Sequence, residues 1–253
     1  MDGLRAVVLD VDGTLVDSER DGHRVAFNLA FEEFSLPYRW SPEEYGELLA
    51  VPGGQQRLIA FLTEQGVAED TRDDLARRLH RRKTELFQEL VEQGRIHPRT
   101  GVRELLDDLA AAGVRMSVAT TGSRAWVSRL LEQLFGLDRF EAVITGEDAP
   151  VLKPDPAAYL RAVEEMSIDA AADVIAVEDS HAGLRAAKAA GLSCVVVVND
   201  YTSGQDFSGA DLVLDAFDGS PAALHDPFGV APEDRLDVAT LARVARCAMG
   251  ADR

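Results

Sequence analysis

The chain has 253 residues, of which 46% are hydrophobic and 28% charged, and its formal net charge at pH 7 is −18. This composition is typical of an ordered globular protein and excludes a largely disordered chain. The negative charge argues against a nucleic-acid partner, because such binding depends on Lys and Arg neutralising phosphates. A phosphorylated small molecule would bind only with the help of a cation or a local basic cluster.

The sequence also bears on the compartment. It lacks a basic start and a run of about 18 apolar residues, so we expect no membrane partner and a cytoplasmic location. Cys194 and Cys247 lack metal-ligand spacing and are predicted to be small buried hydrophobes in a reduced compartment. We expect a monomer.

Short apolar, β-branched runs recur along the chain and indicate buried strands. They lie at residues 6–9, 115–119, 142–145, 174–177 and 194–198. Segments of helical period lie between most of them, and several end at a glycine, which commonly stops a helix. These segments are residues 102–112, 124–135, 156–166 and 182–190. The alternation indicates an α/β fold, a doubly wound parallel sheet covered on both faces.

One part of the chain breaks this alternation. Residues 19–94 show only helical patterns, which predicts a helical insertion after the first strand. Turn and breaker residues at 17–18 and 97–101 are typical of hinges at its two ends. The final segment, residues 219–253, contains a proline loop and a helical pattern from about 236 to 249, and the sequence does not indicate its role.

Candidate chemistry collects where the predicted strands end, because ligands of open parallel sheets bind beyond the carboxyl ends of the strands. Asp10 and Asp12 follow the first run, and Glu178 and Asp179 follow the fourth. An ordinary Asp-Gly turn is the alternative interpretation of the first pair. Four carboxylates together repel one another unless a hard cation lies among them, and Mg²⁺ prefers such oxygen ligands. The pattern therefore predicts a Mg²⁺ site.

The ends of the second and third runs add groups that suit a phosphate. Thr120 offers a hydroxyl beside backbone N–H groups, and Lys153 offers a fixed positive charge. The alternatives are that Thr120 and Thr121 cap the helix that begins near Ser123, that Ser180 caps the next helix, and that the lysine is solvated. Together the four strand ends indicate phosphoryl transfer.

The motifs DVDGT, ATTGS, LKPDP and VEDSHAGLRAAKAAG occur in this order and resemble the four signatures of the haloacid dehalogenase superfamily. The helical insertion resembles the α-helical cap of that superfamily. The segments LVDSERDGHRVAFNLAF, ELLAVPGGQQRL and HRRKTELF are similar to the CbbY-like branch of sugar phosphatases, neighbours of β-phosphoglucomutase. The resemblance implies a Rossmann-like catalytic core, residues 1–16 and 97–253, and a cap, residues 17–96, that selects the substrate.

The same resemblance implies roles for the core residues. Asp10 would attack phosphorus to form an aspartyl-phosphate, and Asp12 would protonate the leaving sugar oxygen and then deprotonate a water. Thr120 and Lys153 would hold the transferring phosphoryl group. Mg²⁺ would be held by Asp10, the backbone carbonyl of Asp12 and Asp179, with Glu178 in the inner or outer shell.

In the cap, Arg57 and Lys83 match positions that contact substrate in related enzymes and would bind a second anionic group. A solvated face is the alternative for Lys83, which belongs to a basic helical run with Arg77, Arg78, Arg81 and Arg82. The full predicted substrate-binding set is Glu19, His23, Gly53, Gly54, Arg57, Lys83, Thr121 and Gly122. Glu19 and His23 would orient sugar hydroxyls or Asp12, although a structural role for the histidine stays open. The two cap glycines would let their loop approach the substrate.

The leading hypothesis is a Mg²⁺-dependent phosphatase of a small sugar phosphate, with xylulose 1,5-bisphosphate as a candidate substrate. A hexose-phosphate mutase of the β-phosphoglucomutase type and a non-catalytic regulatory protein on the same fold are the alternatives. Family members often carry a lysine where this chain has Gln55, which bears on the mutase alternative. Dehalogenation is disfavoured, because it needs neither the second aspartate nor a metal site.

Overall fold

The computed structural model describes residues 4–51, 53–168 and 173–251. The chain forms two compact units, one made of Met1–Val16 and His97–Arg253 and the other of Asp17–Ile96. We call the first unit the core and the second the cap. Within the described ranges, no helix combines the length and apolar character that a membrane span requires.

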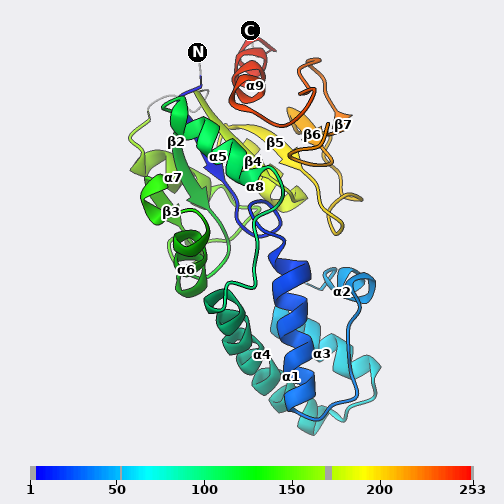
Figure 1. The fold of residues 1–253 in the computed structure, drawn as a ribbon. Coiled ribbons are helices and arrows are strands. Elements are labelled where there is room, and N and C mark those ends of the chain that lie inside the picture. The colour runs from blue at the N-terminus through cyan, green and yellow to red at the C-terminus, as the bar shows by residue number, and fades with distance from the viewer. Residues whose placement is uncertain (1–3, 52, 169–172, 252–253) are drawn as a thin grey trace. The chain divides into compact units, whose positions relative to one another are not determined.

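The core is built on a seven-stranded sheet of order β3-β2-β1-β4-β5-β6-β7 (Figure 1). The strands are β1 (Ala6–Leu9), β2 (Arg115–Ala119), β3 (Ala142–Ile144), β4 (Val174–Glu178), β5 (Ser193–Val197), β6 (Leu212–Leu214) and β7 (Ala223–His225). All neighbouring pairs are parallel except β6 and β7. The predicted α/β fold with a parallel sheet is confirmed. The sequence did not predict β6 and β7, because each has three residues and β7 is mostly exposed.

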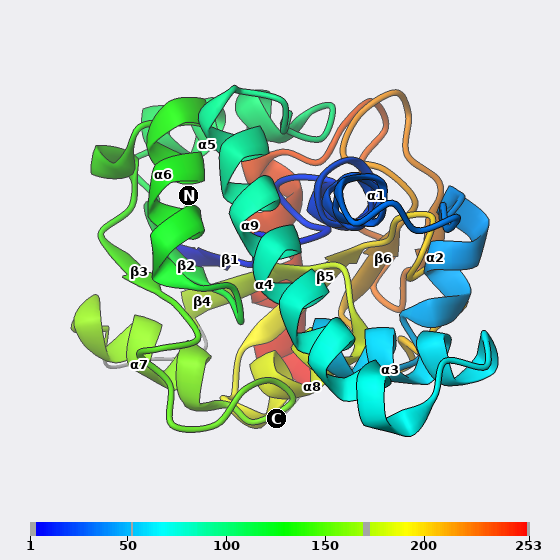
Figure 2. The ribbon, with the colours of Figure 1, turned by 90° about the horizontal axis from the view of Figure 1, so that it is seen from below.

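Helices connect the strands and lie against them. They are α5 (Val102–Ala111), α6 (Arg124–Leu134), the 3₁₀ turn η2 (Leu137–Arg139), α7 (Ala157–Glu165), α8 (His181–Ala189) and α9 (Val238–Ala251). Helices α7 and α8 contact each other, as do α5 and α9, and each of the four packs on strands of the sheet (Figure 2). Helix α9 begins at Val238, two residues later than the sequence pattern predicts.

Strand β1 lies in the centre of the sheet and is buried along its whole length. Ala6 and Val8 belong to an apolar cluster with Tyr159 of α7 and Leu184 of α8. Because successive side chains of a strand point to opposite faces, full burial of β1 means that both faces of the sheet are covered. Cys194 of β5 is buried as predicted, whereas Cys247 on α9 is only half-buried, and both are free thiols.

The strand order reverses beside β1. From β1 the chain continues to β2 and β3 on one side, and β4, β5 and β6 lie on the other side. Such a reversal opens a crevice at the carboxyl ends of the two central strands, where ligands of doubly wound sheets bind. This topology directs attention to the residues that follow β1 and β4.

The described elements of the cap are all helical: η1, a π-helical turn (Ser18–His23), α1 (Arg24–Glu33), α2 (Pro42–Leu48), α3 (Gly54–Glu64) and α4 (Glu69–Glu92). Helix α4 packs against both α1 and α3. The Trp40 ring meets the Phe31 and Phe61 rings edge to face at centroid distances of 4.9 and 5.1 Å, and the three rings form the apolar centre of the cap. The Ser41 hydroxyl and the Glu44 carboxylate form a capping box that fixes the start of α2.

Candidate active site

Two neighbouring parallel strands carry the acidic side chains to one place. Leu9 of β1 pairs with Val177 of β4, and the backbone N–H of Asp10 donates to the Val177 carbonyl at 3.0 Å. Asp10, the first residue after β1, therefore lies beside Glu178, the last residue of β4. Asp179 follows directly. The register of the central strands thus brings three predicted site residues to the reversal point of the sheet.

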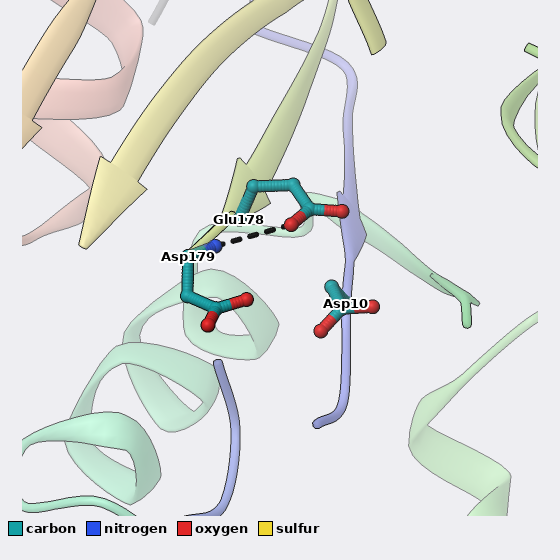
Figure 3. A group of neighbouring side chains, drawn as sticks. All are labelled: Asp10, Glu178 and Asp179. Atoms are coloured by element: carbon teal, nitrogen blue, oxygen red, sulfur yellow. Dashed lines mark hydrogen bonds between the residues drawn. The ribbon is translucent and has the colours of Figure 1, made fainter. Parts of the chain in front are cut away.

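The three carboxylates form a buried group. One oxygen each from Asp10, Glu178 and Asp179 lies within 4.8 Å of the others. Figure 3 shows the three side chains close together, with the Asp179 backbone N–H donating to Glu178 Oε2 at 3.1 Å. Asp12, the fourth predicted carboxylate, is not a member of this group and lies half-buried in the turn two residues after Asp10. Its role at the site stays a prediction.

Lys153 lies directly against this group. Its ammonium donates to Asp10 Oδ1 at 2.6 Å and to Glu178 Oε1 at 2.5 Å. Its side chain is only 5% exposed, so the alternative of a solvated lysine is wrong. A buried ammonium between two carboxylates supplies the positive charge that the acidic group needs.

Glu178 is held from several sides. The Tyr159 hydroxyl donates to Glu178 Oε1 at 2.6 Å, and the Tyr159 ring centroid lies 5.0 Å from the Lys153 ammonium. A Cβ atom at Gly183 would fall 1.9 Å from the Glu178 carboxyl carbon, so helix α8 can pass the carboxylate only with a glycine here. Ser180 caps α8 by accepting from the Gly183 N–H, which agrees with the alternative interpretation of this residue. These contacts hold the Glu178 carboxylate in the position in which it accepts from the Lys153 ammonium.

Burial and the neighbouring charges both shift the pKa values of the group. Burial raises the pKa of Asp10 from 3.8 to about 6, although Lys153 lowers it in part. Burial, together with Asp10 and Glu178, raises the pKa of Asp179 well above its usual range. Burial alone would lower the pKa of Lys153, but its two carboxylate partners outweigh burial and raise that pKa. The site therefore favours any further cation that relieves the repulsion between its carboxylates.

The turn after β1 and the end of β5 surround Asp179. The Asn199 amide donates to Asp179 Oδ2 at 2.7 Å and to the Gly13 carbonyl at 3.2 Å, and the Thr14 hydroxyl donates to Asp179 Oδ1 at 3.4 Å. The Arg99 guanidinium donates to the same Gly13 carbonyl at 2.5 Å. Gly13 has φ +82°, and a Cβ there would lie 2.3 Å from Asp179 Oδ2, so the turn requires a glycine.

The loop after β2 carries the predicted phosphate-binding residues. Thr120 is 1% exposed, and its hydroxyl accepts from the Gly122 N–H at 3.0 Å. Thr121 is exposed and Gly122 half-buried. The alternative that Thr120 and Thr121 cap α6 is wrong, because the N-cap residue is Ser123, which makes no capping hydrogen bond through its side chain.

In the cap, the structure brings Glu19 and Arg57 together through a residue that the sequence did not indicate. The Tyr45 hydroxyl donates to Glu19 Oε2 at 2.5 Å and accepts from Arg57 Nη1 at 3.2 Å. The Arg57 guanidinium also lies over the Tyr45 ring at 5.3 Å, and its Nε donates to the Leu48 carbonyl at 3.0 Å. Tyr45 is fully buried, and Arg57 is 7% exposed.

His23 and Lys83 form a second buried pair in the cap. The Lys83 ammonium lies 3.1 Å from His23 Nδ1 and 4.8 and 5.6 Å from the ring centroids of Phe27 and Phe87. Burial, helped by Lys83, lowers the pKa of His23 well below 6.5, so the imidazole is neutral. A neutral imidazole accepts a hydrogen bond from the ammonium, which makes the two groups compatible.

The basic run on α4 divides between two environments. Lys83 is only 8% exposed, so the alternative of a solvated face is wrong for this residue. Arg77, Arg78 and Arg81 are exposed, as that alternative predicts. The Arg82 guanidinium bonds three carboxylates, those of Glu33, Glu85 and Glu89.

The two predicted cap glycines have different surroundings. Gly53 precedes α3 with φ +83°, and a Cβ there would meet open space. A Cβ at Gly54 would lie 2.9 Å from the His80 ring. Their approach to a substrate stays a prediction.

Four supporting residues were not predicted. Asn199 follows the fifth apolar run and could have been found by the rule that directed attention to the other strand ends. Arg99 stood among turn residues, and Tyr45 and Tyr159 lie in helical patterns where a tyrosine indicates only packing. Nothing in the local sequence of the two tyrosines points to their carboxylate partners.

Comparison with known proteins identifies a family. The sequence profile described as haloacid dehalogenase-like hydrolase matches residues 4–191. The chain is 40% identical to a CBBY-like protein of Arabidopsis thaliana over 92% of this chain and 72% of that protein. It is 39% identical to the protein CbbY of Rhodobacter capsulatus, over 82% of this chain and 91% of that one.

The chain is also similar to a solved structure. A variant of CbbY from Rhodobacter sphaeroides in complex with xylulose 1,5-bisphosphate is 37% identical and superposes with a TM-score of 0.69. The match covers 84% of this chain and 94% of the other. The same relative has also been solved with phosphate, with a TM-score of 0.70.

Proposed function

The chain belongs to the haloacid dehalogenase-like hydrolases, and we propose that it is a Mg²⁺-dependent phosphatase of a sugar bisphosphate that forms an aspartyl-phosphate on Asp10. The observation that carries this proposal is the placement of Asp10 against the Lys153 ammonium and within 4.8 Å of oxygens of Glu178 and Asp179. A nucleophilic carboxylate beside a fixed cation and a divalent-metal site is the arrangement that phosphoryl transfer requires.

Asp10 must be ionised to attack phosphorus. Burial raises its pKa to about 6, and the carboxyl is therefore mostly ionised at neutral pH. In the first step an Asp10 oxygen forms a bond to phosphorus while the bond from phosphorus to the sugar oxygen breaks. Asp12 gives a proton to that departing oxygen. Asp12 then takes a proton from water, the water oxygen bonds to phosphorus, and the Asp10–phosphorus bond breaks to release phosphate.

The donor set fits Mg²⁺. Three buried carboxylates with one ammonium among them form a hard, negatively charged oxygen site, which suits this ion better than a softer metal. We propose that Asp10, Asp179 and the backbone carbonyl of Asp12 hold the ion, with Glu178 nearby. When bound, Mg²⁺ would neutralise carboxylate charge and favour the approach of a phosphate.

Lys153 and Thr120 act on the phosphoryl group itself. The Lys153 ammonium is held in place by two carboxylates, so its charge is already oriented before the substrate arrives. The Thr120 hydroxyl accepts from the Gly122 N–H and keeps its own proton for donation to a phosphate oxygen. The exposed Thr121 and the half-buried Gly122 belong to the same loop and complete this side of the site.

For the substrate we propose xylulose 1,5-bisphosphate. The relative solved with this compound supports the choice, and the cap offers two buried cations, Arg57 and Lys83, for a second phosphate. Glu19 is an acceptor for a sugar hydroxyl, held by Tyr45. The neutral His23 orients Lys83 without adding charge.

The test measures phosphate release by the full chain, first stripped with EDTA and then supplied with Mg²⁺. The substrates are xylulose 1,5-bisphosphate, ribulose 1,5-bisphosphate, glucose 1-phosphate and an aryl phosphate. We expect Mg²⁺-dependent release, fastest with the first, and a loss of at least about a thousand-fold in Asp10→Asn, as for the loss of a nucleophile. Asp70→Asn, at an exposed position on α4, is the matched control. Undiminished release by Asp10→Asn would overturn the mechanism, and isomer formation without phosphate would indicate a mutase.

A further inference from the structure

Asn199 joins two parts of the proposed metal site through a single amide group. It is the second residue after β5, a strand whose end was not among the predicted site segments. Its Nδ2 atom donates one hydrogen to Asp179 Oδ2 at 2.7 Å and lies 3.2 Å from the Gly13 carbonyl, to which it also donates. Gly13 directly follows Asp12. One side chain therefore holds both the Asp179 carboxylate and the turn that contains Asp12.

The orientation of this amide follows from its neighbours. Both groups that face Nδ2 are acceptors, a carboxylate and a carbonyl, whereas Oδ1 faces a donor, the Tyr201 N–H at 2.9 Å. The reverse orientation would set the amide oxygen against two acceptors. The Asn199 backbone is fixed as well, because its N–H donates to the Thr202 hydroxyl at 3.0 Å.

A neutral donor has a specific consequence at a cation site. Asp10 and Glu178 are held by the Lys153 ammonium, which offsets part of their charge. The amide of Asn199 orients Asp179 without carrying a charge of its own, so it neither neutralises the carboxylate nor repels a cation. Groups that hydrogen-bond to metal ligands commonly set metal affinity by orienting those ligands.

We propose that Asn199 is a positioning residue for Mg²⁺, which holds Asp179 and the Asp12–Gly13 turn in the arrangement that binds the ion. The inference rests on the proposed function, because it takes Asp179 and the Asp12 carbonyl as ligands. Arg99 also donates to the Gly13 carbonyl, at 2.5 Å. The Gly13 carbonyl therefore still accepts from Arg99 when Asn199 is replaced. The main loss is the hydrogen bond from Asn199 to Asp179.

The experiment titrates Mg²⁺ into the metal-free full chain by isothermal titration calorimetry, with native protein, Asn199→Ala and a matched control. Gln205→Ala is the control, because Gln205 is an exposed amide in the same segment whose Oε1 accepts from the His181 N–H. For Asn199→Ala we expect the dissociation constant for Mg²⁺ to rise by roughly ten-fold or more, the usual effect of losing an outer hydrogen-bond partner. For Gln205→Ala we expect no change.

Kinetics provides a second readout. The Mg²⁺ concentration that gives half-maximal phosphate release should rise by the same factor in Asn199→Ala, while the rate at saturating Mg²⁺ stays near native. If Asn199→Ala does not fold, Asn199→Ser replaces it, because a serine hydroxyl can accept from the Tyr201 N–H yet is too short to reach Asp179.

The outcomes separate the two proposals. A variant with native Mg²⁺ affinity but lower unfolding stability shows a purely structural role and overturns the inference while leaving the phosphatase proposal standing. A native chain that neither binds Mg²⁺ nor releases phosphate overturns both. A weakened Mg²⁺ affinity with a near-native saturated rate supports the positioning role.

Discussion

Replacing Lys153 with methionine removes one buried charge and keeps most of the side-chain volume. The ammonium lies 2.6 Å from Asp10 Oδ1 and 2.5 Å from Glu178 Oε1, and Glu178 is fully buried. Breaking a buried ion pair on one side typically costs about 3–5 kcal/mol, because the remaining charge has no partner. For a chain of this size that loss corresponds to a fall in melting temperature of roughly 6–20 °C.

The matched control is Lys188→Met. Lys188 also makes an ion pair, with Asp211 at 2.8 Å, but its side chain is 39% exposed. Water reaches the Lys188 ammonium, and the buried Asp211 carboxylate keeps the Cys194 N–H as a donor, so we expect the loss of this pair to cost less than the loss of Lys153. Differential scanning calorimetry of both metal-free variants at pH 8 measures the difference. Equal losses in the two variants would refute the reasoning that burial makes Lys153 important.

The pH dependence gives an independent check on the same variant. Burial already raises the pKa of Asp10 above its unfolded value of 3.8 to about 6, and Lys153 opposes that rise. Without Lys153 the folded pKa rises further. A carboxyl with a raised folded pKa contributes stability at low pH and loses it as the pH rises through that pKa. The deficit of Lys153→Met relative to native should therefore shrink as the pH falls from 8 toward 6, and a constant deficit would contradict the explanation.

Two more substitutions test single hydrogen bonds and a single proton. Tyr159→Phe removes the hydroxyl that donates to the buried Glu178 and should lower the unfolding free energy by about 1–3 kcal/mol, whereas Tyr38→Phe, at a half-buried cap position, should change it little. Because the folded pKa of His23 lies well below 6.5, His23 contributes stability above pH 6.5 that is lost as the pH falls below that value, in opposition to the gain from Asp10. His23→Gln, which keeps an acceptor for Lys83, should remove that part of the loss, and an unchanged acid profile in urea titrations would count against a neutral His23.

The acidic centre was predictable because few alternatives exist for how parallel strands end. Once two buried strands are adjacent and in register, the residues that follow them must meet, and Asp10 and Glu178 do so through the pairing of Leu9 with Val177. The position of the Asp12 side chain was not predictable in this way. A turn abolishes strand alternation, so sequence spacing alone does not fix where the second aspartate points.

The buried lysine of the cap shows a signal that composition conceals. Lys83 stands in a basic run, which is typical of a solvated helix face. Its spacing from Leu79, Leu86 and Leu90 nevertheless places it on the buried stripe of α4, at the i+4, i+7 and i+11 rhythm of apolar positions. A single charged residue on an apolar stripe is thus more informative than the charge of the run around it. Its partner His23 lies on another helical segment and was beyond any local pattern.

The charges of the two units are complementary to different parts of the proposed substrate. When ionised, the three core carboxylates and the Lys153 ammonium leave two negative charges, which repel a phosphate until a divalent ion offsets them. In the cap, the Lys83 ammonium lies beside an imidazole kept neutral by burial and over two aromatic rings. Under the proposed function, we therefore expect the core to need a divalent ion before it accepts a phosphoryl group, whereas the cationic Lys83 of the cap would attract a second phosphate without one. We therefore expect the catalytic rate to depend strongly on Mg²⁺ and the binding of a bisphosphate to depend on it more weakly.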